Sequence, residues 1–459
     1  MSNLTQINLP IVGQLSTEQP AIGQPTKRVS VVTLGCSKNT VDSEVLMGLL
    51  RRNNIELADE AEGSDAVIIN TCGFIDVAKE ESINTILAAA ALKREGKLGQ
   101  IYVAGCLSQR YMDDLEDEIP EVDAYFGVTD FSNILKTINP NLKKDLLSDR
   151  FVPEGARSAY MKLSEGCDNP CSFCAIPLMR GGHVSRPMEE ILMEAAYLAE
   201  KGVKELVVVA QDSTYYGLDL YGKRTLATLL EKLAGVRGIE WVRLMYAYPS
   251  RFPLDILPVM ADNPTICKYM DMPIQHVSDP VLKSMRRGIT RRTLMGLIEK
   301  IRAGVPGIAL RTTLIIGYPN EGEQEFQELL DFVAEAEFER LGVFAYSQEE
   351  NTTAYDLLDP IPREVKEERM ERVMELQRSI SARKNEALIG TTERVFVESE
   401  AGGEYICRSY RDAPEVDGEV YVTSHTPLQP GDFVEVEITD AVDYDLFAEI
   451  KVGSHENGR

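Results

Sequence analysis

Short apolar runs alternate with helix-type spacing along the first third of the chain. The apolar runs cover residues 29–34, 66–70 and 101–104. Apolar positions between Val41 and Leu50, and again over 76–92, recur at the three- and four-residue intervals of a helix. Buried parallel strands are continuously apolar and are joined by helices. The pattern predicts a parallel α/β domain over 27–140, after a Gln-, Pro- and Thr-rich disordered leader over 1–26.

The same alternation continues over residues 153–388. Six apolar runs, each followed by polar residues, cover 160–163, 206–210, 241–244, 269–272, 309–317 and 343–346. Consecutive β/α units of this kind predict a partial (β/α)6 barrel, whose chemistry is expected at the carboxyl ends of the strands. A charged helix over about 363–388 is expected to connect this barrel to the rest of the chain.

Beyond Gly390 the pattern changes to short strands of alternating polar and apolar residues. These strands cover 394–397, 419–422, 433–438 and 446–450 and are separated by Gly, Pro and Asp. Such spacing predicts a small antiparallel β-barrel of about five strands over 391–457. The expected fold class is therefore α/β, with two parallel α/β domains and a C-terminal β-barrel.

Composition agrees with a globular protein of this size. The 459 residues are 44% hydrophobic, and this length suggests about three domains. The amino terminus lacks the basic and apolar regions of a signal peptide, and no apolar run reaches the 18 or so residues of a membrane span. We therefore expect a cytoplasmic protein with no membrane partner. Cysteines in such a protein are typical of metal binding or catalysis rather than of disulfides.

Cys167, Cys171 and Cys174 form a CxxxCxxC loop after the first apolar run of the second domain. Three thiolates this close together suit three irons of a 4Fe–4S cube and leave the fourth iron open to a substrate. Ordinary ferredoxin clusters use four Cys, and structural zinc sites usually close a tetrahedron of four ligands. A zinc loop or three unrelated thiols are the alternatives. The spacing resembles that of the radical S-adenosylmethionine (SAM) enzymes.

Three further cysteines follow predicted strands of the first domain. Cys36, Cys72 and Cys106 each come after one of its three apolar runs, and each stands beside a glycine. The carboxyl ends of parallel strands lie along one edge of the sheet, where ligands bind. The positions therefore predict that three thiols distant in sequence meet and hold a second cluster. Small cysteines buried in an ordinary core are the alternative.

Polar residues on other strands of the second domain are candidates for binding SAM. Gln211 and Asp212 follow the run at 206–210, and Arg311 belongs to the run at 309–317. We expect these three side chains to contact the polar groups of SAM. Local hydrogen bonds within the barrel are the alternative use of polar residues at these positions.

After the leader, the whole chain resembles the methylthiotransferases, which combine an N-terminal cluster domain, a radical SAM core and a C-terminal TRAM β-barrel. Several segments resemble the RimO group, the ribosomal-protein methylthiotransferases: 34–39, 42–44, 209–212, 246–249, 270–276 and 344–350. Ser37-Lys38-Asn39 stands where the tRNA-modifying MiaB group usually has Gln-Met-Asn. Minor departures are Met270 and Met272, where Leu and Ile are commoner, and the extended leader.

The resemblance implies a reaction and its cofactors. RimO-type enzymes insert a methylthio group at the β-carbon of an aspartate in small-subunit ribosomal protein twelve, and they use two 4Fe–4S clusters, two SAM molecules and a sulfur donor. The cluster at the CxxxCxxC loop would cleave SAM to a 5′-deoxyadenosyl radical, which abstracts the hydrogen. The second cluster would present sulfur through its open iron. An electron donor and a sulfur source are the further partners implied, and we expect a monomer.

Charge separates the candidate substrates independently of this resemblance. The formal net charge is −25, and residues 391–459 carry 5 Lys or Arg against 16 Asp or Glu, a balance of −11. An acidic surface repels phosphate backbones and favours a basic partner such as a ribosomal protein. A tRNA adenosine methylthiotransferase of the MiaB type is the alternative, and a non-catalytic iron–sulfur electron carrier is a third hypothesis.

Overall fold

The computed structural model describes residues 27–139 and 150–451 of the chain. The predicted leader over 1–26 lies outside the described residues, as do positions 452–457 of the predicted β-barrel domain. Within the described part of the chain, no helix is both long enough and apolar enough to cross a membrane.

The chain divides into two compact units. The first comprises the described chain up to Ala156 together with Ala175–Gly182. The second comprises Arg157–Cys174 and the chain from His183 onward. The sequence pattern does not predict that the chain returns to the first unit over Ala175–Gly182. The three predicted domains, over 27–140, 153–388 and 391–457, stay a prediction.

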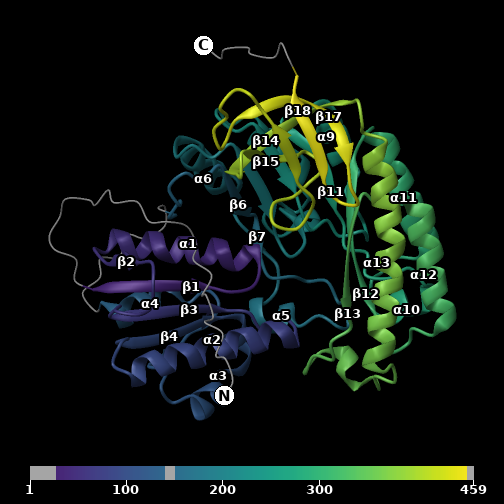
Figure 1. The fold of residues 1–459 in the computed structure, drawn as a ribbon. Helices are drawn as coiled ribbons and strands as arrows, with labels where there is room; N and C mark the ends of the chain where they lie inside the picture. Colours follow the sequence, from purple (N-terminus) through teal and green to yellow (C-terminus); the bar gives the residue numbers. More distant parts are fainter. Residues whose placement is uncertain (1–26, 140–149, 452–459) are drawn as a thin grey trace, which may run out of the picture. The chain divides into compact units, whose positions relative to one another are not determined.

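The first unit is a parallel sheet with helices on both faces (Figure 1). Its strands lie in the order β2-β1-β3-β4-β5, and every neighbouring pair is parallel. The strands are β1 (Arg28–Thr33), β2 (Glu56–Ala58), β3 (Ala66–Thr71), β4 (Gln100–Gly105) and β5 (Ala124–Tyr125). The helices are α1 (Ser37–Arg52), α2 (Asp76–Arg94), α3 (Cys106–Glu118), α4 (Phe131–Ile138) and α5 (Ile176–Arg180). The predicted parallel α/β fold is confirmed, and the three apolar runs form β1, β3 and β4.

Two apolar layers hold this sheet between its helices. On one face, Leu50 of α1 packs with Ile68 of β3, and on the other, Ile86 of α2 and Leu107 of α3 pack with Ile69. Neighbouring side chains of a strand point to opposite faces, so a strand covered on both faces must be apolar at consecutive positions. Burial of each such side chain contributes about 1.5–3 kcal/mol. The continuous apolar runs in the sequence follow from this arrangement.

The second unit contains six parallel strands in sequence order, the arrangement of a partial barrel. They lie in the order β13-β12-β11-β10-β9-β6. The strands are β6 (Ser158–Lys162), β9 (Glu205–Val209), β10 (Trp241–Leu244), β11 (Ile266–Asp271), β12 (Ala309–Ile316) and β13 (Arg340–Ala345). The main helices are α6 (Met188–Glu200), α8 (Leu226–Ala234), α9 (Ile256–Asp262), α10 (Asp279–Ser284), α11 (Arg291–Gly304), α12 (Glu323–Ala336) and α13 (Arg363–Glu386). Each predicted run forms one strand, and the predicted partial (β/α)6 barrel is confirmed.

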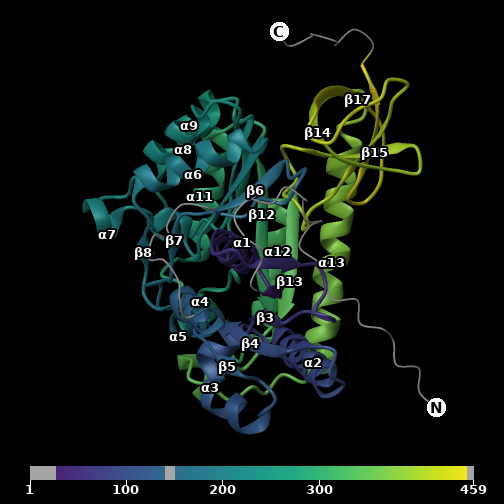
Figure 2. The same cartoon turned by 90° about the vertical axis from the view of Figure 1, so that its left-hand side faces the viewer.

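The chain then closes into a small five-stranded β-barrel, to which α13 leads (Figure 2). Its strands are β14 (Thr392–Ala401), β15 (Glu404–Ser409), β16 (Val420–Thr423), β17 (Phe433–Ala441) and β18 (Leu446–Ile450). Four neighbouring pairs are antiparallel, as predicted, whereas β16 and β18 run parallel. An odd number of strands cannot alternate in direction all the way round a closed barrel, so closure requires a parallel pair. We call this the C-terminal barrel.

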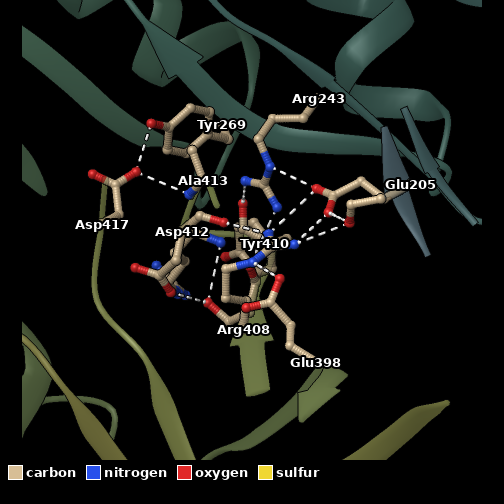
Figure 3. A network of polar contacts seen from close by, with 12 residues as sticks. Glu205, Arg243, Tyr269, Glu398, Arg408, Tyr410, Asp412, Ala413 and Asp417 are labelled. Atoms are coloured by element: carbon tan, nitrogen blue, oxygen red, sulfur yellow. Dashed lines mark hydrogen bonds and ion pairs between the residues drawn. The ribbon is translucent and has the colours of Figure 1, made fainter. Parts of the chain in front are cut away.

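One segment of the C-terminal barrel, residues 408–417, docks on the six-stranded sheet, and we call it the docking segment. Every strand of the sheet contributes at least one side chain that contacts it, among them Tyr160 of β6, Glu205 of β9, Arg243 of β10, Tyr269 of β11, Arg311 of β12 and Arg340 of β13. Figure 3 shows the centre of this network. The C-terminal barrel is therefore part of the core of the second unit and not a freely hinged appendage.

Glu205 is the central anion of the docking contact. Its carboxylate lies between Arg243, at 2.8 Å, and Arg408 of the docking segment, at 2.5 Å. Burial alone would raise the pKa of Glu205, but the two guanidinium groups outweigh it and hold that pKa at about 2. A buried carboxylate paired and hydrogen-bonded in this way stays ionised at neutral pH.

Candidate functional site: two cysteine trios

The three cysteines of the first unit, which we call the first trio, lie at the carboxyl edge of its sheet. Cys36 follows β1 and caps α1, Cys72 follows β3 directly, and Cys106 follows β4 directly and begins α3. The strands β1, β3 and β4 are neighbours in the sheet. The structure thus places these three strand ends side by side, as expected from the sequence.

The loops of the first trio pack closely against one another. Gly35 adopts a φ of +89°, and a Cβ atom there would lie only 2.9 Å from Cys72 Sγ. Burial raises the pKa of the Cys72 thiol to about 12, and the neighbouring thiols of Cys36 and Cys106 add to that rise. The three sulfurs are therefore close enough to act on one another electrostatically.

A buried arginine lies beside the first trio. Arg180 of α5 donates from Nη2 to Asn39 Oδ1 at 2.6 Å and to Asp42 Oδ2 at 3.1 Å. Burial raises the pKa of the Cys106 thiol, and the Arg180 guanidinium, which hydrogen-bonds to that thiol, opposes the rise. Met179 of the same helix packs against Cys106. The short return of the chain to the first unit thus brings a cation to the trio.

The CxxxCxxC loop, which we call the second trio, belongs to the second unit. Its three thiols are half-buried. Asn169 lies inside the loop, and its Nδ2 is 3.5 Å from Cys167 Sγ. Burial raises the pKa of the Cys167 thiol to about 11. The hydrogen bond from the backbone N–H of Asn169 opposes this rise. Cys171 receives a hydrogen bond from Arg287 Nη1 at 3.3 Å.

Two of the three residues expected to contact SAM lie next to the second trio. Asp212 Oδ2 accepts a hydrogen bond from Asn169 Nδ2 at 2.8 Å, and Oδ1 accepts from the Thr214 backbone N–H at 2.9 Å. Gln211 Nε2 donates to Glu165 Oε1 at 3.1 Å. The buried Oε1 of Gln211 has no hydrogen-bond partner among the described residues. Contact of Gln211 and Asp212 with SAM stays a prediction, and Asp212 holds Asn169 in place.

Arg311 is not placed with the second trio. It is the third residue of β12, near the amino end of that strand, whereas the trio follows the carboxyl end of β6. Its guanidinium pairs with Asp271 at 2.9 Å and with Asp417 of the docking segment at 3.2 Å. These ion pairs correspond to the alternative use of a barrel arginine, and contact of Arg311 with SAM stays a prediction.

Buried polar atoms without partners among the described residues lie beside both trios and fit a bound group such as an iron–sulfur cluster. The buried Oγ atoms of Ser37 and Ser108, next to Cys36 and near Cys106, find no partner within the described chain. Arg287 Nε, beside Cys171, likewise has no acceptor there. Unsatisfied buried polar groups of this kind are expected where a bound group completes the site.

Four side chains that shape these sites were not predicted from the sequence. Asn169, Tyr248, Arg180 and Arg287 reach the cysteines from loops and helix ends, where no periodicity marks them. Only Arg180 carries a signal, because it is a lone charge that ends the apolar run Ala-Ile-Pro-Leu-Met.

Family models cover most of the described chain. The Radical SAM superfamily matches residues 161–333, and the TRAM domain matches 389–450. The model described as uncharacterized protein family UPF0004 matches 28–127, which includes the first trio. These matches fall on the partial barrel, the C-terminal barrel and the first unit.

Curated relatives match the chain almost from end to end. The ribosomal protein uS12 methylthiotransferase RimO of Cytophaga hutchinsonii is 53% identical over 433 residues, which cover 94% of this chain and 99% of that protein. The chain belongs to the RimO family. RimO of Christiangramia forsetii is 51% identical over 92% of this chain and 94% of its own, and RimO of Desulforamulus reducens is 46% identical over 92% and 99%.

Solved structures share the RimO-family fold at lower identity. TsrM from Kitasatospora setae, a radical SAM methyltransferase with cobalamin and a 4Fe–4S cluster bound, matches with a TM-score of 0.52 and 12% identity. That match covers 70% of this chain and 72% of TsrM, and at this identity it shows the fold alone. As a RimO-family radical SAM methylthiotransferase, the enzyme uses SAM and 4Fe–4S clusters, and its two trios agree with two clusters.

Proposed function

We propose that this enzyme methylthiolates ribosomal protein uS12, at the β-carbon of an aspartate. The observation that carries the proposal is the 53% identity, over 94% of the chain, to a relative named for that substrate. The identity extends through the first unit, the partial barrel and the C-terminal barrel, so it covers both trios and not only a shared SAM-binding core.

The two trios have separate tasks in this proposal. Cys167, Cys171 and Cys174 would hold the cluster that meets SAM, and the first trio would hold the sulfur-presenting cluster. When bound, these groups supply the hydrogen abstraction and the sulfur that an unactivated C–H bond requires. The chain supplies orientation, because side chains locked by their own hydrogen bonds hold a site in its working geometry. Asp212 fixes Asn169 against Cys167 in this way.

The surface of the C-terminal barrel supports a basic protein substrate. Glu435 and Glu437 of β17 are exposed, and Glu449 of β18 lies opposite Glu437. Such a face attracts the Lys and Arg side chains of a ribosomal protein and repels the phosphates of tRNA. The tRNA alternative is therefore not favoured. The hypothesis of a non-catalytic electron carrier is not favoured either, because the relatives are named as transferases.

Other partners complete the proposal. All eight cysteines are free, which supports work in the reducing cytoplasm. A one-electron donor must reduce the cluster of the second trio, and a sulfur source must replenish the cluster of the first. We propose that the enzyme acts as a monomer.

An anaerobic assay tests this function. Reconstituted enzyme, SAM, a reductant and sulfide are offered either uS12 or unmodified tRNA, and the products are read by mass spectrometry. We expect one methylthio group on one aspartate of uS12 and no change in the tRNA. Modification of tRNA alone would contradict the proposal.

Cysteine variants test the need for each trio in the same assay. Cys36→Ala and Cys171→Ala should each abolish methylthiolation, because each removes a cluster ligand. Cys407→Ala is the matched control, since Cys407 is buried in the C-terminal barrel core and belongs to neither trio. Full activity in Cys36→Ala would contradict the role of the first trio.

A further inference from the structure

A buried arginine lies against one thiol of the second trio. Arg287 is 4% exposed, and its Nη1 donates to Cys171 Sγ at 3.3 Å. Its Nη2 donates to the Pro273 carbonyl at 2.5 Å. The guanidinium carbon lies 4.3 Å from the ring centroid of Tyr248, whose hydroxyl is 3.6 Å from the same sulfur. The Arg287 side chain is therefore held rigidly, with one edge toward Cys171.

Within the described chain, no ion pair joins Arg287 to a carboxylate. The groups that act most strongly on it within the described chain are Cys171, Tyr248 and Cys174. Burying a cation costs several kcal/mol unless an anion compensates it. Its Nε donor also lacks an acceptor among the described residues. The surroundings of Arg287 thus fit an anionic group that carries acceptor atoms and touches Cys171, as a thiolate-bound iron–sulfur cluster does.

The next residue along the chain shows that this placement is specific. Arg286 is exposed, and its nearest polar partner is Thr353 Oγ1 at 3.4 Å. The turn after α10 therefore turns one arginine outward and the other onto the second trio. Of these two arginines, Arg287 is the one that contacts a cysteine of the second trio and can therefore affect its cluster.

We propose that Arg287 is a positioning residue that holds Cys171 in place and, through its charge, raises the reduction potential of the cluster at the second trio. The potential of a 4Fe–4S cluster depends on nearby charge, on hydrogen bonds to its sulfurs and on exposure to solvent. Reduction adds one electron and so one negative charge, and a fixed cation beside a ligand sulfur stabilises that charge. Arg287 thereby makes the cluster easier to reduce by a one-electron donor.

This inference rests on the proposed function, because it takes the second trio to be cluster ligands. The test is an anaerobic redox titration of the full chain without SAM, followed by the electron paramagnetic resonance signal of the reduced cluster. The parent protein carries Cys36→Ala, Cys72→Ala and Cys106→Ala, so that a single cluster is titrated. Iron content is measured for every variant.

The expected result is a lower potential when the charge is removed. At the potential where the parent is half reduced, Arg287→Gln should show a ratio of reduced to oxidised cluster at least tenfold lower, which corresponds to about 59 mV for a one-electron couple. Arg287→Lys, which keeps the charge but not the planar fork, should stay within threefold of the parent. Arg286→Gln, the matched control, should have the same reduction potential as the parent.

Each contrary outcome is distinct. An Arg287→Gln protein with four irons that titrates with the parent would overturn the inference. If Arg287→Gln fails to retain iron, full iron in Arg287→Lys supports the positioning role, whereas loss of iron from both overturns it. A parent that binds no cluster at the second trio would overturn the proposed function, and the inference with it.

Discussion

At the scale of single residues, the buried charges of the second unit are paired, and one substitution can leave a buried charge without its partner. Glu205 is fully buried between two arginines, and its pKa of about 2 is below the ordinary value of 4.5. A carboxylate with a depressed pKa contributes stability above its unfolded pKa, and loses that contribution as the pH falls toward its folded pKa. The contribution of Glu205 is therefore complete above about pH 4.5 and disappears toward pH 2.

Glu205→Gln should lower the free energy of unfolding of the second unit by about 3–5 kcal/mol at pH 7, because it leaves the buried guanidinium of Arg243 without its anion and that of Arg408 with Glu398 alone. Urea unfolding followed by circular dichroism measures this. The difference from the unsubstituted protein should shrink as the pH falls from 4.5 toward 2. Glu240→Gln, which removes an exposed partner of Arg394, is the control and should cost at most about 1 kcal/mol. Equal losses in the two variants would contradict the assignment.

Arg180 offers a second test at this scale. Arg180→Met removes the cation that joins Asn39, Asp42 and the Cys106 thiol, so we expect the first trio to lose its cluster while the second trio keeps its own. Bound iron should fall from about eight to about four per chain. Arg94→Met removes an exposed arginine of the same unit and should leave the iron content unchanged. Full iron in Arg180→Met would show that the first trio does not need this cation.

At the scale of elements, the turn between β1 and α1 depends on a glycine. A Cβ atom at Gly35 would lie 2.6 Å from Cys72 Cβ, whereas a Cβ at Gly63 would meet nothing within 4 Å. Both glycines have positive φ, +89° and +80°, so alanine carries a similar backbone cost of about 1–2 kcal/mol at each. Gly35→Ala should cost about 1–3 kcal/mol more than Gly63→Ala in urea unfolding, from overpacking. It should also lower iron binding at the first trio, and equal losses would contradict the close packing of the two loops.

Elements with a continuous apolar core were predictable from the sequence, and short ones were not. β1, β3 and β4 are buried between helices on both faces, so their sequences are continuous apolar runs. β2 and β5, of three and two residues, are edge strands too short to carry a pattern. The cysteine positions followed from strand ends, but the arginines beside them depend on packing between distant segments. The ion pair of Arg311 could not be predicted for the same reason, because its partner Asp417 lies 106 residues further along the chain.

At the scale of the whole molecule, the second unit should not survive loss of its C-terminal barrel. Ending the chain at Ile389 removes the docking segment, which contacts a side chain from every strand of the six-stranded sheet, and leaves Glu205, Arg243 and Arg340 without these partners. We expect the shortened chain to aggregate and to lose resistance to limited proteolysis. The control is full-length Asp440→Ala, which changes an exposed residue of the same barrel. A monodisperse shortened chain that still cleaves SAM would contradict this prediction.

The chain returns to the first unit over the eight residues Ala175–Gly182, and this limits how recombination can exchange that unit between related genes. A fragment that ends at Ala156 carries all of the first trio but neither Met179, which packs on Cys106, nor Arg180, which pairs with Asp42. Exchange of this unit between related enzymes therefore requires two pieces of gene, one of them immediately after the codon for Cys174. A single crossover cannot deliver both pieces without the intervening CxxxCxxC loop, so recombination passes on the two trios together.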